Sequence, residues 1–189
     1  CSATAGNQNA RFGYSNTTGG VGMVFNGTSA PFIDGEHPGV SFFGGFAYPV
    51  STWFSMIYRR ASGTAQLYLN GSAAGSSWTD SPDAAGDDFF RAAICCNGGA
   101  GVELRVAEGF FYGAAIALGE VAAIGIGWCP MAVRLQNLLT HHHVFGNDSP
   151  ETDSMGTFPL TVGSGWVAAT HAPTMFPQHG AGCFRRRGK

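Results

Sequence analysis

Charged side chains are scarce in this 189-residue chain, where Asp, Glu, Lys and Arg together make up 12% of all residues. That is about half the share usual in a soluble domain. Low charge favours association, so the composition favours a surface covered by neighbouring protein over a free monomer. The hydrophobic share of 44% and the aromatic share of 13% are enough to build a core and argue against disorder.

Over most of the chain, basic residues are fewer than acidic residues. Four of the ten lie in the last five positions, where Arg185, Arg186 and Arg187 precede Lys189. The rest of the chain holds six basic and twelve acidic residues, which argues against a nucleic-acid-binding body. We interpret the tail as a solvated terminus, with contact to nucleic acid or to an acidic partner surface as the alternative.

Long apolar runs and metal-binding cysteine pairs are also lacking. No stretch of 18 apolar residues occurs, so no membrane span is predicted, and no signal peptide is visible. No Cys-x-x-Cys pair supports a zinc site. The cysteines are odd in number, and we expect buried free thiols rather than the disulfide framework of a small secreted domain. They are Cys1, Cys95, Cys96, Cys129 and Cys183.

Motifs for catalysis are missing as well, and we expect neither a catalytic residue nor a cofactor. Gly163-Ser164-Gly165 lacks the spacing of a nucleophile elbow, although a Ser-His-Asp triad is recognised by geometry alone. In His141-His142-His143, successive side chains of an extended chain point to opposite faces, so the three cannot converge on one metal ion. We therefore expect a loop or strand with ordinary histidines.

Four aspartates fall in the loop that we expect over residues 71–88. Calcium is bound by several carboxylate and carbonyl oxygens, which makes this loop a weak calcium candidate. The spacing differs from that of an EF-hand, so a solvated acidic loop is the favoured interpretation. The four are Asp80, Asp83, Asp87 and Asp88.

Residues 53–72 carry the clearest pattern that is present. A run from Trp53 to Arg60 and a run from Ala65 to Asn70 flank a short turn. In the second run Ala65, Leu67 and Leu69 alternate with polar positions and Tyr68, which predicts a strand with the first set facing a core. Asn70-Gly71 then supplies the positive φ of a tight turn.

Further patterns predict short strands and one helix. Residues 114–124 are alanine-rich, with Leu118, Val121 and Ala122 spaced for one helical face and Gly125 and Gly127 as stop signals. The predicted strands are Gly20–Phe25, Val40–Tyr48, Phe89–Cys96 and Val102–Ala107.

In this order the elements resemble the laminin-G-like, concanavalin-A-like lectin and glucanase sandwich. The resemblance rests on the Trp53-led strand, on Leu67-Tyr68-Leu69-Asn70-Gly71, and on Glu103-Leu104-Arg105-Val106 ahead of the helix at Leu118–Ala123. It covers roughly residues 53–175 and implies an all-β, antiparallel β-sandwich (jelly roll) with one short helix. We expect this domain over residues 1–130, followed by an extended C-terminal arm over 131–189 with short strands near Phe158–Val162 and Gly165–Ala169.

Three later motifs are similar to the continuation found in bacteriophage members of the family. They are Gly127-Trp128-Cys129-Pro130, Arg134-Leu135-Gln136-Asn137-Leu138 and His171-Ala172-Pro173. Leu135-Gln136 and Ala172 depart from the residues usual there. The glucanases of the family carry a Glu-x-Asp-x-x-Glu strand that supplies paired carboxyls, and no such triplet occurs here.

The resemblance therefore implies a non-enzymatic bacteriophage structural protein on the capsid surface of the virion, such as a capsid decoration or head-associated protein. Its expected partners are the major capsid protein, other virion proteins and further copies of itself. The alternative is a lectin-like carbohydrate-binding module of a tail fibre or a secreted protein. Trp78 and Tyr112 are the candidate sugar-stacking residues, although aromatic residues also suit a core or an interface.

Overall fold

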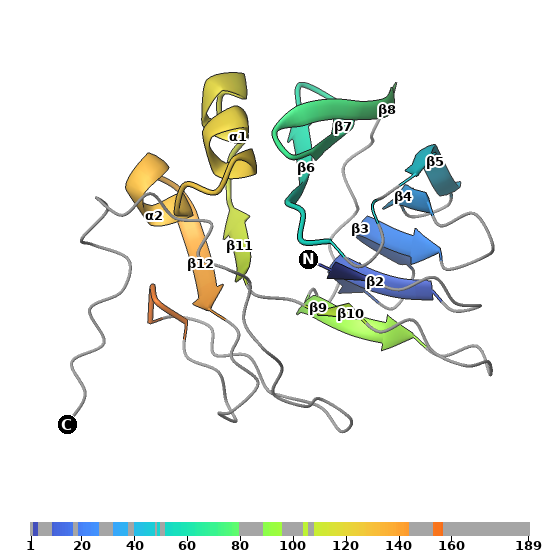
Figure 1. Cartoon of the computed structure of the whole chain (residues 1–189), viewed down its shortest axis with the longest axis horizontal. Coiled ribbons are helices and arrows are strands. Elements are labelled where there is room, and N and C mark those ends of the chain that lie inside the picture. The colour runs from blue at the N-terminus through green and yellow to red at the C-terminus, as the bar shows by residue number, and fades with distance from the viewer. Residues whose placement is uncertain are drawn as a thin grey trace. The chain divides into compact units, whose positions relative to one another are not determined.

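The computed structural model of the chain (Figure 1) describes residues 2–3, 9–16, 19–26, 32–37, 40–47, 49, 52–79, 89–95, 104–105, 108–143 and 153–156. The chain divides into two compact units, residues 2–104 and residues 105–189, the second grouped with Cys1. The described elements are mostly antiparallel strands with little helix, so the predicted β-rich class is confirmed. The expected domain boundary at residue 130 lies inside the second unit.

The unit of residues 2–104 holds a five-stranded sheet in the order β5-β4-β3-β2-β9 and a three-stranded sheet in the order β6-β7-β8. All neighbouring strands in both sheets run antiparallel. The five-stranded sheet consists of β2 (Asn9–Asn16), β3 (Gly19–Asn26), β4 (Phe32–His37), β5 (Val40–Ala47) and β9 (Phe89–Cys95). Three of these strands, β3, β5 and β9, confirm sequence predictions.

The predicted hairpin forms the three-stranded sheet, which consists of β6 (Met56–Ala61), β7 (Thr64–Leu69) and β8 (Ser72–Thr79). Both of its turns use paired residues with positive φ, at Ser62-Gly63 and at Asn70-Gly71. Two consecutive residues of positive φ are what a two-residue hairpin loop needs to follow the twist of its strands. The turn predicted at Asn70-Gly71 is confirmed.

The inside-outside alternation predicted for β7 holds only over its first half. Ala65 and Leu67 are fully buried as expected, but Tyr68 is also buried and Leu69 is only half-buried. The neighbours Met56 and Ile57 on β6, which lie opposite Leu69 and Tyr68, are both buried as well. Adjacent strand residues point to opposite faces, so this end of the sheet is covered on both faces, and the alternation breaks down there.

The loop expected over residues 71–88 begins instead with a strand, β8. Its sequence of Ser, Ala and Gly has low strand propensity, so pairing with β7 determines its conformation. The Gln66 amide donates to the carbonyls of Leu67 (2.9 Å) and Ala74 (2.8 Å) where the register shifts. Side-chain bonds of this kind support a sheet that weak propensity would not.

The second unit contains β11 (Glu108–Tyr112), α1 (Leu118–Gly125), the single-turn α2 (Pro130–Val133) and β12 (Leu138–His143). β11 and β12 pair antiparallel, with a bulge between Phe111 and Tyr112. The predicted helix is confirmed, and Gly127, at φ 104°, follows its end as the stop signal suggested. α2 and β12 were not predicted. The strand predicted at Val102–Ala107 is described only as β10 (Leu104–Arg105), which pairs with β1 (Ser2–Ala3).

The buried side of α1 differs from the predicted one. The spacing placed Leu118, Val121 and Ala122 on the core face, but the buried residues are Val121, Ile124 and Gly125, and Leu118 is exposed. Both sets have helical spacing, and the helix offers apolar residues on either side. The tertiary contacts of Val121 and Ile124 therefore decide which side is buried.

The expectation of free thiols is wrong for Cys129. Its side chain is buried, and it forms a disulfide bond. The side chains of the four other cysteines lie outside the described residues. Spacing along the sequence does not show which cysteines meet in space, because pairing depends on the distance between their Cβ atoms.

Neither helix in the described part of the chain is long and apolar enough to cross a membrane. The arm strands expected near Phe158–Val162 and Gly165–Ala169 lie outside the described residues.

The Asn70 turn provides a test of the local argument. Asn70 has φ 48°, its backbone N–H donates to the Ser55 carbonyl (3.0 Å), and its Oδ1 accepts from the Ser55 N–H (2.9 Å). Asn70→Ala removes this side-chain hydrogen bond and places alanine in a left-handed backbone conformation that it rarely adopts. Together the two effects should lower the free energy of unfolding by about 2 kcal/mol. Glycine adopts this backbone angle without strain, so Asn70→Gly loses only the side-chain hydrogen bond. It should lower the free energy of unfolding by about 1 kcal/mol.

Urea unfolding followed by circular dichroism measures both Asn70 variants. Equal losses in the two variants would contradict a role for the backbone angle at this turn.

Candidate functional site

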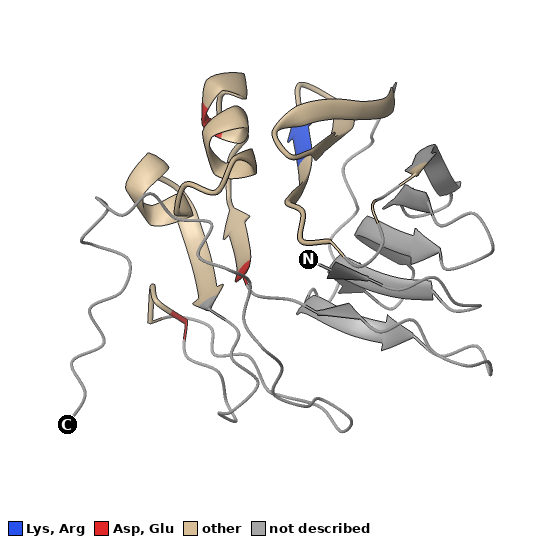
Figure 2. Ribbon diagram, in the orientation of Figure 1, with Lys and Arg blue, Asp and Glu red and all other residues tan. Residues whose placement is uncertain are grey.

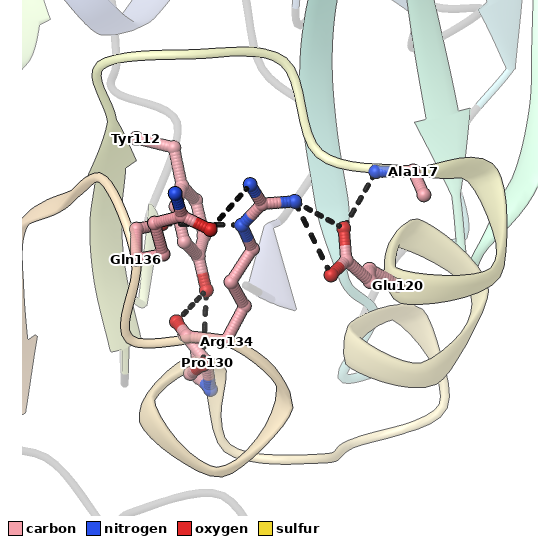
Figure 3. Close-up of polar contacts among 6 residues, drawn as sticks. All are labelled: Tyr112, Ala117, Glu120, Pro130, Arg134 and Gln136. Carbon is pink, nitrogen blue, oxygen red and sulfur yellow. Dashed lines mark hydrogen bonds and ion pairs between the residues drawn. The ribbon is translucent and has the colours of Figure 1, made fainter.

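A network of polar contacts joins β11, α1 and α2 in the second unit, with Tyr112 in one part of it and Arg134 connecting the parts (Figure 3). The Tyr112 hydroxyl lies 2.9 Å from the carbonyl oxygen of Pro130 and 3.0 Å from that of Arg134, so its single proton is shared between two acceptors. The Tyr112 ring also meets the Phe110 ring edge-on, at 5.9 Å between centroids. Tyr112 therefore attaches α2 to the strand pair.

The second part of the network links α1 to the end of α2. Glu120, at the third position of α1, accepts a hydrogen bond from the Ala117 backbone N–H (2.6 Å) and satisfies one donor that the helix start leaves unpaired. Arg134 Nη1 lies 3.3 and 3.4 Å from the two Glu120 carboxylate oxygens. The same guanidinium donates through Nε and Nη2 to the backbone and side-chain oxygens of Gln136, so Arg134 is fixed on two sides.

The chemistry available to Tyr112 is limited by its surroundings. Burial raises the pKa of Tyr112 to about 12, with a further contribution from the negative charge of Glu120 that Arg134 partly offsets. The phenol therefore stays protonated at ordinary pH and acts as a hydrogen-bond donor. Tyr112 on β11 therefore holds α2 in place and does not act as a base or nucleophile.

A second polar cluster lies where β11 and β12 pair. His141 is buried, and its Nε2 lies 2.6 Å from Glu108 Oε2, a charge-assisted contact across the strand pair. The other ring nitrogen of His141, Nδ1, is buried and has no hydrogen-bond partner within the described residues. His142, which follows on the strand, points to the opposite face and is also buried.

Asp153 attaches a short segment, residues 153–156, to β12. Its backbone forms a bridge with His142, and its carboxylate Oδ1 accepts from the backbone N–H groups of His141 (2.9 Å) and Met155 (3.0 Å). The Ser154 N–H donates to the His141 carbonyl at 2.7 Å. A buried side-chain oxygen that accepts two backbone N–H groups satisfies donors that would otherwise lack a partner, so Asp153 is an anchor for this turn.

The Glu108–His141 pair has the composition of an acid-base dyad but lacks access. The His141 side chain is 2% exposed, so a substrate cannot reach Nδ1, the ring nitrogen that does not contact Glu108. Among the residues that the structure describes, no three His, Cys, Asp or Glu side chains lie where they could hold a metal ion together. What the cluster does in the described structure is to hold β11, β12 and Asp153 together.

The described part of the second unit exposes several large apolar side chains. Six large apolar side chains are exposed on β11, α1, β12 and the turns between them. α1 carries a single charged residue, Glu120, and is drawn almost entirely in the colour of uncharged residues (Figure 2). The six exposed side chains are Phe111, Leu118, Ile126, Trp128, Leu135 and Leu139.

Most of the residues singled out from the sequence lie outside the part that the structure describes. This holds for the loop aspartates Asp80, Asp83, Asp87 and Asp88, and for the tail residues Arg185, Arg186 and Arg187. Trp78 lies on β8, but its side chain is outside the described set. Tyr112 is described, and its hydroxyl is engaged within the protein rather than offered to a ligand.

Sequence reasoning missed the contact between Glu108 and His141 and the anchor at Asp153. Glu108 and His141 are 33 positions apart, and no periodic pattern connects them. The apolar and aromatic residues Phe110, Phe111 and Tyr112 were the only signal of a strand at β11. Recognising that β11 pairs with β12 would have placed His141 beside Glu108.

The pKa of Tyr112 predicts a late titration. The hydroxyl's contribution to stability is fully present below pH 10, the ordinary pKa, and is lost as the pH rises through about 12. Tyr112→Phe should lower the free energy of unfolding by about 1 kcal/mol at neutral pH. The difference in tyrosinate absorbance between the wild type and Tyr112→Phe should appear near pH 12, with circular dichroism confirming the fold. A component that titrates near pH 10 would contradict the buried donor.

The anchor at Asp153 predicts a large loss on truncation. Asp153→Ala leaves the N–H groups of His141 and Met155 without an acceptor and should lower the free energy of unfolding by about 2–3 kcal/mol in urea. Asp153→Asn keeps one side-chain oxygen and serves as the matched control, with a smaller loss. A change below roughly 0.5 kcal/mol in Asp153→Ala would show that the carboxylate does not hold the segment.

Comparison of the chain with protein-family models, with curated protein sequences and with solved structures finds no match in any of the three. The resemblance to laminin-G-like sandwiches therefore stays a prediction from the residues that carry it.

Proposed function

We propose that this chain is a non-enzymatic structural protein of a bacteriophage virion, a capsid decoration or other head-associated protein that binds neighbouring capsid subunits. The proposal includes the finer fold, an antiparallel β-sandwich of the laminin-G-like kind, and a location on the capsid surface. The antiparallel sheets of residues 2–104 support the sandwich, and the phage-like motifs around Trp128 and Arg134 support the setting.

One observation carries the proposal: the described surface of the second unit is apolar and nearly uncharged. Residues 109–140 contain two charged residues, Glu120 and Arg134, and these pair with each other. Around them, exposed side chains such as Ile126, Trp128 and Leu135 face outward. Exposed apolar and aromatic side chains with little charge in the same stretch of chain favour a protein-protein contact.

The polar clusters support a contact role over a catalytic one. The Tyr112 hydroxyl and the Arg134 guanidinium are used within the protein, and His141 is enclosed. Each group holds elements of the second unit in place, and none points its chemistry outward. These contacts fix the conformation of the described surface that we expect a partner to bind.

The disulfide at Cys129 is consistent with this location. Disulfides persist in oxidising surroundings, which include the surfaces of virions, and are rare in reducing compartments.

Binding to capsids tests the proposal. Purified chain should bind saturably to capsid shells of the encoding phage that were assembled without it, as measured by co-sedimentation. Trp128 is exposed and has the character of an interface anchor, so Trp128→Ala should weaken the binding about 30-fold. Ala73→Glu, at an exposed position of β8 in the other unit, is the control and should bind as the wild type does.

Absence of saturable binding to such shells would overturn the proposal. So would a glycan array on which the chain binds one sugar and Trp78→Ala does not, because that result would assign a carbohydrate-binding module instead.

A further inference from the structure

The Asn70-Gly71 pair between β7 and β8 is chemically reactive as well as structural. Asparagine is among the thermolabile residues. It reacts readily when glycine follows it, because glycine has no side chain to shield its own backbone nitrogen. Asn70 is exposed, so water reaches this turn.

The reaction is deamidation through a cyclic succinimide. The Gly71 backbone nitrogen loses its proton and attacks Cγ of Asn70, and the side-chain amide nitrogen takes up a proton and leaves as ammonia. Water then adds to one of the two succinimide carbonyls and breaks the bond from that carbonyl to the ring nitrogen. Opening at Cγ gives aspartate. Opening at the backbone carbonyl gives isoaspartate, in which the main chain runs through Cβ and Cγ.

The folded turn holds the two reacting atoms apart. Asn70 and Gly71 have φ values of 48° and 81°, and they form a two-residue loop, since Leu69 pairs directly with Ser72. Such a loop is a type I′ turn, and a left-handed residue has a ψ of about +47°. At that ψ the Asn70 Cβ and the Gly71 nitrogen lie on opposite sides of the Cα–C bond. Succinimide closure needs them on the same side, so the turn must open first.

Contacts around Asn70 hold the turn in this unreactive form. Its Oδ1 accepts from the Ser55 N–H (2.9 Å), and its own N–H donates to the Ser55 carbonyl (3.0 Å). Ring closure would turn Cγ toward Gly71 and take Oδ1 away from Ser55. The rotation of ψ would also separate Leu69 from Ser72. These interactions therefore oppose the reaction while the hairpin is closed.

The isoaspartate product does not fit the turn from which it forms. It lengthens the main chain at position 70 by a methylene group, so a type I′ loop can no longer join Leu69 to Ser72 in the same register. β8 has low strand propensity and depends on its pairing with β7. This strand is therefore the one that loses support when the turn changes.

From these observations we propose that Asn70-Gly71 is a deamidation site that the closed hairpin protects and that reacts when the turn opens. The chemistry is slow beside opening and closing, so its rate follows the fraction of molecules in which the turn is open. Isoaspartate formation makes an opening irreversible. The isoaspartate content at position 70 therefore measures how often this end of the sheet has opened.

Peptide mapping by mass spectrometry, after incubation of the full chain at mildly alkaline pH with and without urea, tests the protection. The sequence holds three Asn-Gly pairs, at 26–27, 70–71 and 97–98. In urea all three should deamidate at similar rates, so the other two are internal standards. Without urea the pair at 70–71 should react at least about 10-fold more slowly than in urea, which corresponds to an open fraction of about one tenth or less.

Equal rates at 70–71 with and without urea would overturn the protection by the turn. No reaction at 70–71 in urea, while the other two pairs react, would overturn the site itself.

Ser55→Pro tests the contact that holds Asn70. It removes the N–H group that Asn70 Oδ1 accepts, just before β6, where a strand tolerates proline. Loss of this hydrogen bond should raise the native rate of deamidation about 5-fold. Ser55→Ala keeps the backbone N–H and is the matched control, with the wild-type rate. An unchanged rate in Ser55→Pro, or an equal rise in both variants, would overturn the role of this contact.

A further comparison separates the added charge from the added chain length, in a background of Asn26→Gln and Asn97→Gln that leaves one reactive pair. The isoaspartate form, made in urea and refolded, should unfold at a lower urea concentration than Asn70→Asp. The aspartate carries the same charge, tolerates the left-handed backbone and accepts the Ser55 N–H. Equal unfolding midpoints would contradict the irreversible loss of the turn.

Discussion

The pairing of β11 with β12 is the constraint on which the described part of the second unit depends. It brings Glu108 to His141 and gives the segment around Asp153 an edge on which to bind. It also presents the Tyr112 ring to α2. The helices lie in the chain between the two strands, so strand pairing closes a loop that contains them. The ordering entropy of that loop is offset by the two polar clusters and by the burial of Val121 and Ile124.

The distribution of polarity in this unit is unusual. Among its described residues, charged groups contact one another or a buried histidine: Arg134 meets Glu120, and Glu108 meets His141. Exposed positions are taken instead by residues such as Trp128 and Ile126. A partly exposed ion pair contributes little to stability, but here it also joins the two charged side chains of residues 109–140 to each other. The same contacts that order the helices therefore leave residues 109–140 without net charge, which links the internal architecture to the proposed contact role.

Local sequence signals predicted the elements whose cause is local. Asn70-Gly71 specified its turn because few residues adopt positive φ, and the range of α1 followed from its alanines and the glycines after it. Signals failed where distant residues decide. β8 forms because β7 lies beside it, and Leu118 faces outward because Val121 and Ile124 find tertiary contacts. Neither the Glu108–His141 contact nor the bond at Cys129 has a signature in spacing, since both join residues that the fold brings together.

The bond at Cys129 also makes the redox state of the solution a structural variable. Cys129 is the N-cap residue of α2, immediately before the proline whose carbonyl accepts the Tyr112 hydroxyl. A reductant would cut a covalent connection at the start of that helix and leave it held by non-covalent contacts such as those of Tyr112 and Arg134. Protein handled with thiols and protein handled in air are then two chemical species, which differ in how firmly this surface is fixed.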